Sequence, residues 1–299
     1  MTTDLLPSWN DGPTRDTLVE LLEGAADIEP ARRVAVFDND GTLWCEKPNY
    51  TQFDFLVGEL HEAVATTPEL RVRPEYAALL DGDAEAMHAV GLIPIAHALV
   101  ELSRGMGPEA FDQRVRAFFD NAVHASGRSY RALTYAPMVE LLDALRDAGI
   151  TPFLVTGGGA EFVRAVCDEL YDIPQWHVVG TTVTYDVHDV DGVPVLRRTA
   201  QVLGDPNEGD AKVSNIRLHL GTRPILAAGN SAGDARMLDY VLGADGDGVA
   251  LLVDHDDDER EYAYESVAGT FEAEPVLETA RRRGWTVASM RDDWNRVFE

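Results

Sequence analysis

The chain has 299 residues, enough for two domains or for one large α/β domain with an insertion. A hydrophobic fraction of 45% supports a packed core and excludes a disordered chain. The formal net charge of −27 argues against nucleic acid or an anionic membrane surface as a partner, and it means that an anionic substrate needs a local positive group or a bound metal.

No basic start followed by an apolar segment is visible in residues 1–30, and no apolar run approaches membrane-spanning length. We therefore expect a soluble, cytoplasmic protein without a membrane segment. Two cysteines, Cys45 and Cys167, are too few for a disulfide framework and are expected to be free, buried thiols. The oligomeric state is left open.

In chain order, residues 13–24 predict a short helix with Pro near its start and Gly at its end, and residues 33–37 predict a buried strand. From 51 to 130 the apolar spacing is helical throughout, over residues 52–64, 75–80, 84–103 and 108–122. An all-helical block between strands predicts an inserted cap. We expect a core domain of residues 1–48 and 131–299 and a helical cap domain of residues 49–130.

Strand-helix alternation then resumes. Strands are predicted at 150–156, 224–228 and 249–253, helices at 137–148, 160–170, 210–220 and 232–242, and a hairpin of 178–184 with 193–199 about the turn Asp191-Gly192. This alternation predicts an α/β fold with a Rossmann-like, doubly wound, mainly parallel sheet. Ligands of such sheets bind outside the carboxyl ends of the strands.

The first predicted strand ends in two carboxylates, Asp38 and Asp40, followed by Gly41 and Thr42. Residues i and i+2 of an extended chain share a face, so both carboxylates begin by pointing the same way. They repel each other unless a cation lies between them. A buried strand with an unfavourable end is the alternative.

Three further stretches lie at strand ends or helix starts. Thr156 precedes three glycines, which offer a hydroxyl and exposed amides for phosphate, although a plain glycine turn is the better explanation of that stretch alone. Lys212 opens a predicted helix and by itself reads as a surface lysine. The segment 229–234 (GNSAGD) places an amide, a hydroxyl and a carboxylate in one turn, and by itself it reads as a helix cap.

Together the four stretches resemble the haloacid dehalogenase-like hydrolase (HAD) superfamily, whose first motif, Asp-x-Asp-x-Thr, matches residues 38–42. Thr156 matches the second motif, Lys212 the third, and residues 229–234 the fourth, Gly-Asp-x-x-x-Asp. The hairpin and the Gly-Asn-Ser turn are similar to the phosphoserine phosphatase-like branch. Residues 6–12, 37–46 and 284–287 resemble bacterial HAD hydrolases that carry only this generic name.

The resemblance implies a mechanism. Asp38 is the expected nucleophile, and Asp40 is the expected proton donor and base. The expected phosphate ligands are Thr156, Gly157, Gly158 and Lys212, and the expected Mg²⁺ site combines Asp38, the Asp40 carbonyl, Asn230 and Asp234.

The resemblance also suggests the reaction. Dehalogenases of this superfamily lack the second aspartate, because a halide needs no proton on leaving. Asp40 therefore favours hydrolysis of a small phosphorylated metabolite. A phosphotransferase or mutase stays open as an alternative, as does a non-catalytic binding protein, for which Asn230 in place of an acid is the hint.

Two acidic stretches need separate treatment. Glu46 lies near the position where phosphoserine phosphatases are expected to read the substrate head group, but one residue out of register, so it is either a substrate-binding residue or an exposed loop acid. The neighbouring Trp44 either walls the pocket or anchors the loop. The run 254–259 (DHDDDE) lacks the glycine and terminal acid of a calcium loop, and we expect it to be a solvated acidic loop.

Overall fold

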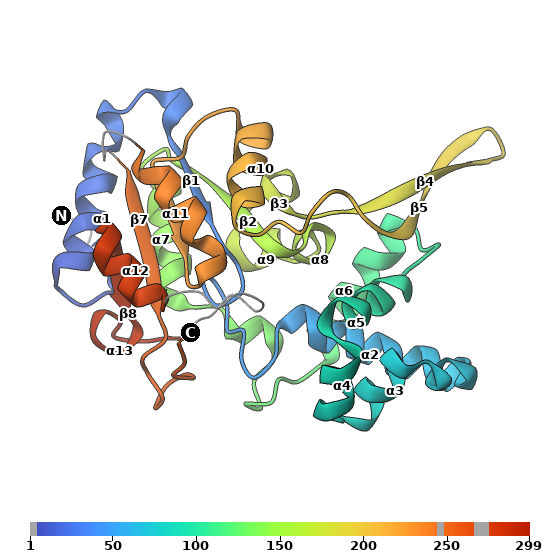
Figure 1. Ribbon diagram of the computed structural model, residues 1–299. Coiled ribbons are helices and arrows are strands. Elements are labelled where there is room, and N and C mark those ends of the chain that lie inside the picture. The colour runs from blue at the N-terminus through green and yellow to red at the C-terminus, as the bar shows by residue number, and fades with distance from the viewer. Residues whose placement is uncertain (1–4, 244–247, 266–274) are drawn as a thin grey trace.

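The computed structural model describes residues 5–243, 248–265 and 275–299. Its core is a parallel sheet of six strands in the order β3-β2-β1-β6-β7-β8 (Figure 1). The strands are β1 (Val34–Phe37), β2 (Thr151–Gly159), β3 (Val178–Thr181), β6 (Leu226–Gly229), β7 (Val249–Asp254) and β8 (Thr286–Ser289). The predicted Rossmann-like, doubly wound sheet is confirmed.

Strand β1 lies at the centre and pairs in parallel with both β2 and β6. The chain winds from β1 toward β3 on one side and from β6 toward β8 on the other, so the order reverses beside β1. Such a reversal opens a crevice at the carboxyl ends of the strands, where ligands of these folds bind. The residue that follows β1 is Asp38.

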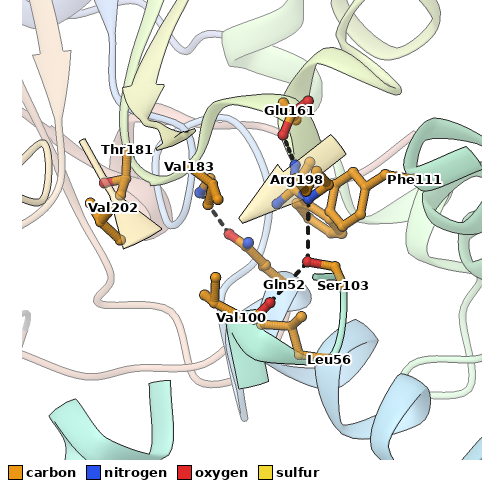
Figure 2. Close-up of a pocket in the computed structure, with 12 residues that line it drawn as sticks. Gln52, Leu56, Val100, Ser103, Phe111, Glu161, Thr181, Val183, Arg198 and Val202 are labelled. Carbon is orange, nitrogen blue, oxygen red and sulfur yellow. Dashed lines mark hydrogen bonds and ion pairs between the residues drawn. The ribbon is translucent and has the colours of Figure 1, made fainter. Parts of the chain in front are cut away.

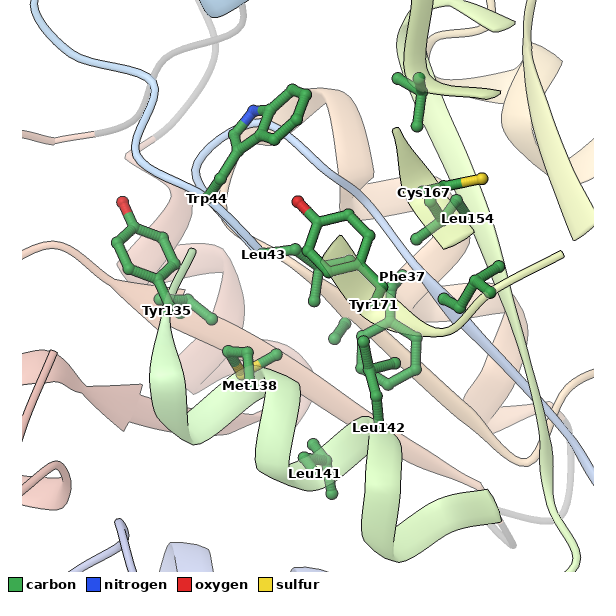
Figure 3. Close-up of a cluster of buried hydrophobic side chains, with 14 of the residues drawn as sticks. Phe37, Leu43, Trp44, Tyr135, Met138, Leu141, Leu142, Leu154, Cys167 and Tyr171 are labelled. Carbon is green, nitrogen blue, oxygen red and sulfur yellow. The ribbon is translucent and has the colours of Figure 1, made fainter. Parts of the chain in front are cut away.

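Helices cover both faces of the sheet. They are α1 (Pro13–Gly24), α7 (Ala136–Asp147), α8 (Ala160–Arg164), α9 (Cys167–Tyr171), α10 (Asp210–Leu220), α11 (Ala235–Leu242), α12 (Val276–Arg283) and α13 (Met290–Asp293). Successive residues of β1 point alternately to the two faces of the sheet and pack against the helices on each face. Ala35 and Phe37 join the apolar cluster beneath α1, α7 and α8 (Figure 3), whereas Val36 joins the cluster beneath α10, α11 and α12.

The helical block between β1 and β2 consists of α2 (Thr51–Thr66), α3 (Pro74–Asp81), α4 (Ala84–Val90), α5 (Leu92–Glu101) and α6 (Pro108–Asn121). It has an apolar cluster of its own around Leu60, Tyr76 and Leu99, while α6 packs on the main core. The single helix predicted over 84–103 is wrong, because the chain breaks at Gly91, whose φ is 91°. The domain boundaries stay a prediction.

The predicted hairpin is partly wrong. Val178–Thr181 is β3 at the edge of the main sheet, and the hairpin pairs β4 (Val183–Val190) with β5 (Val193–Val202). Its turn is as predicted, with positive φ at Asp191 (54°) and Gly192 (82°). The hairpin projects from the core beside the helical block (Figure 1). At its base, β5 meets a cap loop, since Gly105 N donates to Arg198 O at 2.8 Å and Arg198 N donates to Met106 O at 2.9 Å.

Other differences are local. The helix predicted over 160–170 is split into α8 and α9 at Val166, whose φ of −133° is not helical. The helix predicted over 232–242 begins with a 3-10 turn, η6 (Ala232–Asp234), before α11. Both cysteines are free and buried, as expected. Within the described ranges, the longest helices are too short or too polar to cross a bilayer.

Candidate active site

The site lies at the carboxyl edge of the sheet, where β1, β2, β6 and β7 end side by side. Asp38 follows β1, and its backbone N–H still donates to Ala228 O of β6 at 2.9 Å. The chain then turns at Gly41, whose φ is 73°. A Cβ at this position would overlap the side-chain amide of Asn230, so the turn brings the first and fourth motifs into direct contact.

Lys212 lies at the centre of the site. Its ammonium donates to Asp38 Oδ1 and to Asp234 Oδ1, both at 2.6 Å, and the residue is only 1% exposed. Burial lowers the pKa of a lysine, but the two carboxylates outweigh it and raise the pKa of Lys212 above its ordinary value. Lys212 therefore stays protonated in the site, and it is not the surface lysine that the sequence alone suggested.

Both carboxylate oxygens of Asp234 accept hydrogen bonds from other groups of the protein. Oδ1 accepts from Lys212, and Oδ2 accepts from the backbone N–H groups of Asn230 and Ser231 at 3.1 and 3.0 Å. The Ser231 hydroxyl also donates to Oδ2, at 3.1 Å, and completes a capping box at the start of η6. This arrangement fixes the turn after β6 and holds the lysine in place.

The two carboxylates of the first motif have different surroundings. Asp38 is 6% exposed, and burial together with the nearby Asp234 raises its pKa, while Lys212 opposes that rise. Asp40 accepts from the indole Nε1 of Trp44 at 2.9 Å. Burial raises the pKa of Asp40 to about 6, near the range that suits a proton donor at neutral pH. Trp44 is buried and anchors the loop.

The stretch after Thr156 stays extended to the end of β2. The Thr156 hydroxyl is buried and accepts from Gly158 N at 2.9 Å, and Gly159 N donates to Gln52 Oε1 of the helical block at 2.8 Å. A side chain on Gly157 would overlap the carboxylate of Glu208. The second motif lies close to the first, since a Cβ built on Gly158 would lie 3.6 Å from Asp40 Oδ2.

Glu46 is 6% exposed, which rules out the exposed loop acid. Its Oε1 accepts from Tyr264 OH at 2.7 Å and from Asn230 Nδ2 at 3.2 Å. Lys47 lies 4.0 Å from the same oxygen. Glu46 is therefore part of the buried hydrogen-bond network behind the site.

The expectation of a solvated loop over 254–259 is partly wrong, since Asp258 and Glu259 are exposed but other residues of the run are not. His255 and Asp257 are buried, at 2% and 3% exposure. His255 Nε2 lies 2.7 Å from the carbonyl of Gly41, and its ring stacks on Tyr264 with centroids 4.4 Å apart. Because β7 ends at the same sheet edge as β1, this segment packs behind the first motif and supports its turn.

Sequence reasoning also missed Glu208, which precedes α10. Although the residue as a whole is exposed, its carboxylate is enclosed by the loops at Gly157 and Gly233, and this burial raises its pKa. No pattern in the sequence pointed to it. His255 did carry a signal, since it is the second residue after the predicted strand 249–253.

Acidic groups outnumber the cations that contact them here. Asp38, Asp40, Glu208 and Asp234 lie near Lys212, which contacts Asp38 and Asp234 directly, and Glu46 lies behind Asn230. The described residues contain no cluster of three or more His, Cys, Asp or Glu side chains placed to hold a metal together. They do offer a mixed oxygen set, because neither Asp38 Oδ2 nor the Asp40 carbonyl has a hydrogen-bond partner in the described chain. With the amide of Asn230, these donors suit Mg²⁺.

A sheet of this topology with these four stretches at its switch point defines a hydrolase of the HAD type. The family model for haloacid dehalogenase-like hydrolases matches residues 35–239. The chain belongs to this family of hydrolases. No curated protein matches its sequence.

Two solved structures of proteins of unknown function share the fold. A conserved protein of unknown function from Anaerococcus prevotii is 14% identical with a TM-score of 0.61, over 96% of this chain and 94% of that one. A protein of unknown function from Bordetella pertussis is 20% identical with a TM-score of 0.52, over 86% and 97%. A probable phosphoserine phosphatase from Vibrio cholerae is 14% identical with a TM-score of 0.41, over 85% and 59%.

Proposed function

We propose that this hydrolase cleaves a small phosphomonoester with the help of Mg²⁺, through a phosphorylated Asp38. The observation that carries the proposal is the ion pair of Lys212 with Asp38 at 2.6 Å in a buried crevice. Lys212 opposes the rise in the pKa of Asp38 that burial causes, and it thereby favours the ionised form that a nucleophile requires. Among the described residues, Oδ2 of Asp38 has no hydrogen-bond partner.

Asp40 is the proposed proton carrier. Its raised pKa of about 6 keeps part of the population protonated near neutral pH, so it can donate to the leaving alkoxide. The resulting carboxylate then accepts a proton from the water that attacks the phosphoryl group on Asp38. This exchange releases phosphate and restores both aspartates.

The phosphoryl oxygens are proposed to bind Thr156, the amides of Gly157 and Gly158, and Lys212. A hydroxyl, two amides and an ammonium around one point stabilise the charge that spreads over these oxygens in the transition state. In the present arrangement Gly158 N is bonded to the Thr156 hydroxyl, so phosphate binding exchanges that bond for one to the ligand.

Mg²⁺ is proposed to be held by Asp38, the Asp40 carbonyl and Asn230, and when bound it offsets the repulsion between the nucleophile and the substrate. Asp234 was predicted as a further ligand. Because both of its oxygens are engaged by Lys212 and by the turn, we assign it the role of positioning Lys212. The helical block of 49–130 is proposed to act as the cap that covers the substrate.

The test is phosphate release from para-nitrophenyl phosphate, with Mg²⁺ and with a chelator. The wild type should turn over only with the metal, and Asp38→Asn should lose turnover. The exposed acid Asp205 provides a matched control, since Asp205→Asn removes the same charge away from the nucleophile. Unchanged phosphate release by Asp38→Asn would sink the proposal.

A further inference from the structure

A pocket of about 80 Å³ lies where the helical block, the base of the hairpin and the end of β2 meet (Figure 2). Its walls are largely apolar and include Leu56, Val100, Phe111 and Phe162. A water-sized atom needs roughly 10–15 Å³ on this measure, so the pocket accommodates on the order of six non-hydrogen atoms.

Gln52 connects this pocket to the catalytic carboxylates. Its side chain lines the pocket, and its Oε1 accepts from Gly159 N at 2.8 Å. A Cβ built on Gly158 would lie 3.2 Å from that oxygen and 3.6 Å from Asp40 Oδ2. Gln52, which lines the pocket, therefore lies close to the proposed proton donor Asp40.

Arg198 of β5 is the cation of the pocket (Figure 2). It is 5% exposed, and its guanidinium carbon lies 3.9 Å from the centre of the Phe111 ring. Its Nε donates to Ser103 Oγ at 3.2 Å, and its Nη1 pairs with Glu161 of α8. Within the described chain, Nη2 has no hydrogen-bond partner, and the buried Nη1 makes no hydrogen bond beyond its ion pair with Glu161.

The polar end of the pocket therefore has balanced charges, but the Arg198 guanidinium lacks hydrogen-bond acceptors among the described residues. Arg198 is buried and Glu161 is partly buried; they form one ion pair, so the polar end carries no net charge when both are ionised. A donor without an acceptor in an apolar surrounding is unfavourable, and a ligand oxygen removes that cost. A neutral oxygen preserves the balance, whereas a carboxylate adds an uncompensated negative charge close to Glu161.

We propose that this pocket receives the alcohol part of the phosphoester and selects short, uncharged alcohols that carry a hydroxyl or carbonyl oxygen. This inference rests on the proposed phosphatase function and names the class of its substrate. Arg198 supplies the hydrogen bond, and Glu161 rejects alcohols that bear a carboxylate. Neither residue belongs to the four motifs at the sheet edge.

Glycerol 3-phosphate and 3-phosphoglycerate test the proposal, because they share a three-carbon skeleton and differ in a hydroxymethyl group against a carboxylate. Burial raises the pKa of Glu161 to about 7, so assays at pH 8.5 keep it ionised. We expect kcat/KM for glycerol 3-phosphate to exceed that for 3-phosphoglycerate by about 10- to 100-fold. Glu161→Gln should shrink this ratio by about 10-fold or more.

Glu23→Gln is the matched control, since Glu23 is an exposed acid of α1 that lies outside the pocket. Its ratio should equal that of the wild type. The double variant Glu161→Gln/Arg198→Met removes the donor without leaving an unpaired carboxylate, and it should lower kcat/KM for glycerol 3-phosphate. A general loss of activity lowers kcat/KM for both substrates equally, so it does not change the ratio of the two kcat/KM values.

Two results overturn the inference: a wild type that accepts both substrates equally, or a ratio that Glu161→Gln leaves unchanged. Methyl phosphate has an alcohol too short to reach the pocket, so its hydrolysis tests the proposed phosphatase function independently of the pocket. If the wild type hydrolyses methyl phosphate without discriminating the longer pair, the pocket assignment alone is wrong. Equilibrium binding of the pair to Asp38→Asn measures the same selectivity without turnover.

Discussion

Replacing Asp40 by asparagine is expected to stabilise the metal-free protein while removing the group that we propose to carry protons. Asparagine has nearly the same shape and retains an oxygen that can accept from Trp44 Nε1, a bond of 2.9 Å in the structure. What the substitution removes is a negative charge held in a buried site beside Glu46, whose charge also raises the pKa of Asp40. Function and stability oppose each other here.

The magnitude follows from the pKa of Asp40, which burial raises from 3.8 to about 6. A tenfold change in an ionisation constant corresponds to about 1.4 kcal/mol, so the charged form costs the folded state ~2–3 kcal/mol. The cost is absent below pH 3.8, where the carboxyl is protonated in both states, and it grows as the pH rises through about 6. Asparagine avoids the cost at every pH.

Urea unfolding in the presence of a chelator, at pH 5 and at pH 8, measures the effect. Asp40→Asn should be more stable than the wild type at pH 8 by ~2–3 kcal/mol, and the advantage should shrink by about 1 kcal/mol at pH 5. The exposed Asp205 offers the matched charge removal, Asp205→Asn, which should show no such pH-dependent gain. The reasoning is refuted if Asp40→Asn is no more stable than the wild type at pH 8. It is also refuted if the difference in unfolding free energy between the two proteins is the same at pH 5 and pH 8.

Three further changes test the network around the site. Lys212→Met removes the cation that pairs with the buried carboxylates of Asp38 and Asp234. It should abolish turnover and lower the unfolding free energy by about 3–5 kcal/mol, as measured by urea titration. Tyr264→Phe removes the 2.7 Å bond to Glu46 and should lower stability by about 1–2 kcal/mol, as measured by thermal unfolding. Gly41→Ala should cost clearly more than Gly82→Ala in the same assay; both glycines have positive φ, but only a Cβ at Gly41 meets a neighbouring side chain.

Asp38, Thr156 and Lys212 could be predicted to meet, because a parallel sheet places the carboxyl ends of its strands along one edge. That rule needs only the type and order of the elements, which the hydrophobic spacing indicates. The same rule applied to His255, which follows β7, would have placed it at the site. The run of acids around it suggested a solvated loop instead.

Other features depend on tertiary packing. Glu208 reaches the site through an irregular segment, whose path no spacing rule encodes. The sequence assigns residues 178–184 to one strand, whereas the structure divides them at Thr182, because β3 completes the edge of the sheet and β4 leaves it. Similarly, GNSAGD predicts a turn with oxygen donors, but only the position of Lys212 reveals that both oxygens of Asp234 are already in use.

Asn230 departs from the acid that the family pattern has at this position, and Glu46 supplies a physical reason. The Asn230 amide donates to the buried carboxylate of Glu46 at 3.2 Å. An aspartate would place two carboxylates in contact, and unit charges about 4 Å apart repel by up to ~4 kcal/mol at an effective dielectric constant of 20. Asparagine therefore allows an acid at position 46 to coexist with the oxygen at position 230 that we propose as a metal ligand.

A double-mutant cycle tests this explanation. In a chelator at pH 8, Asn230→Asp should destabilise the protein by about 2–4 kcal/mol, and adding Glu46→Gln should restore at least ~1 kcal/mol of the loss. The restored part measures the repulsion, because glutamine retains an oxygen for the Tyr264 hydroxyl and can donate to the new carboxylate. Additive effects of the two changes would mean that Glu46 does not determine the residue at 230. With Mg²⁺ present, the Asn230→Asp deficit should shrink, because a cation bound there attracts the added charge.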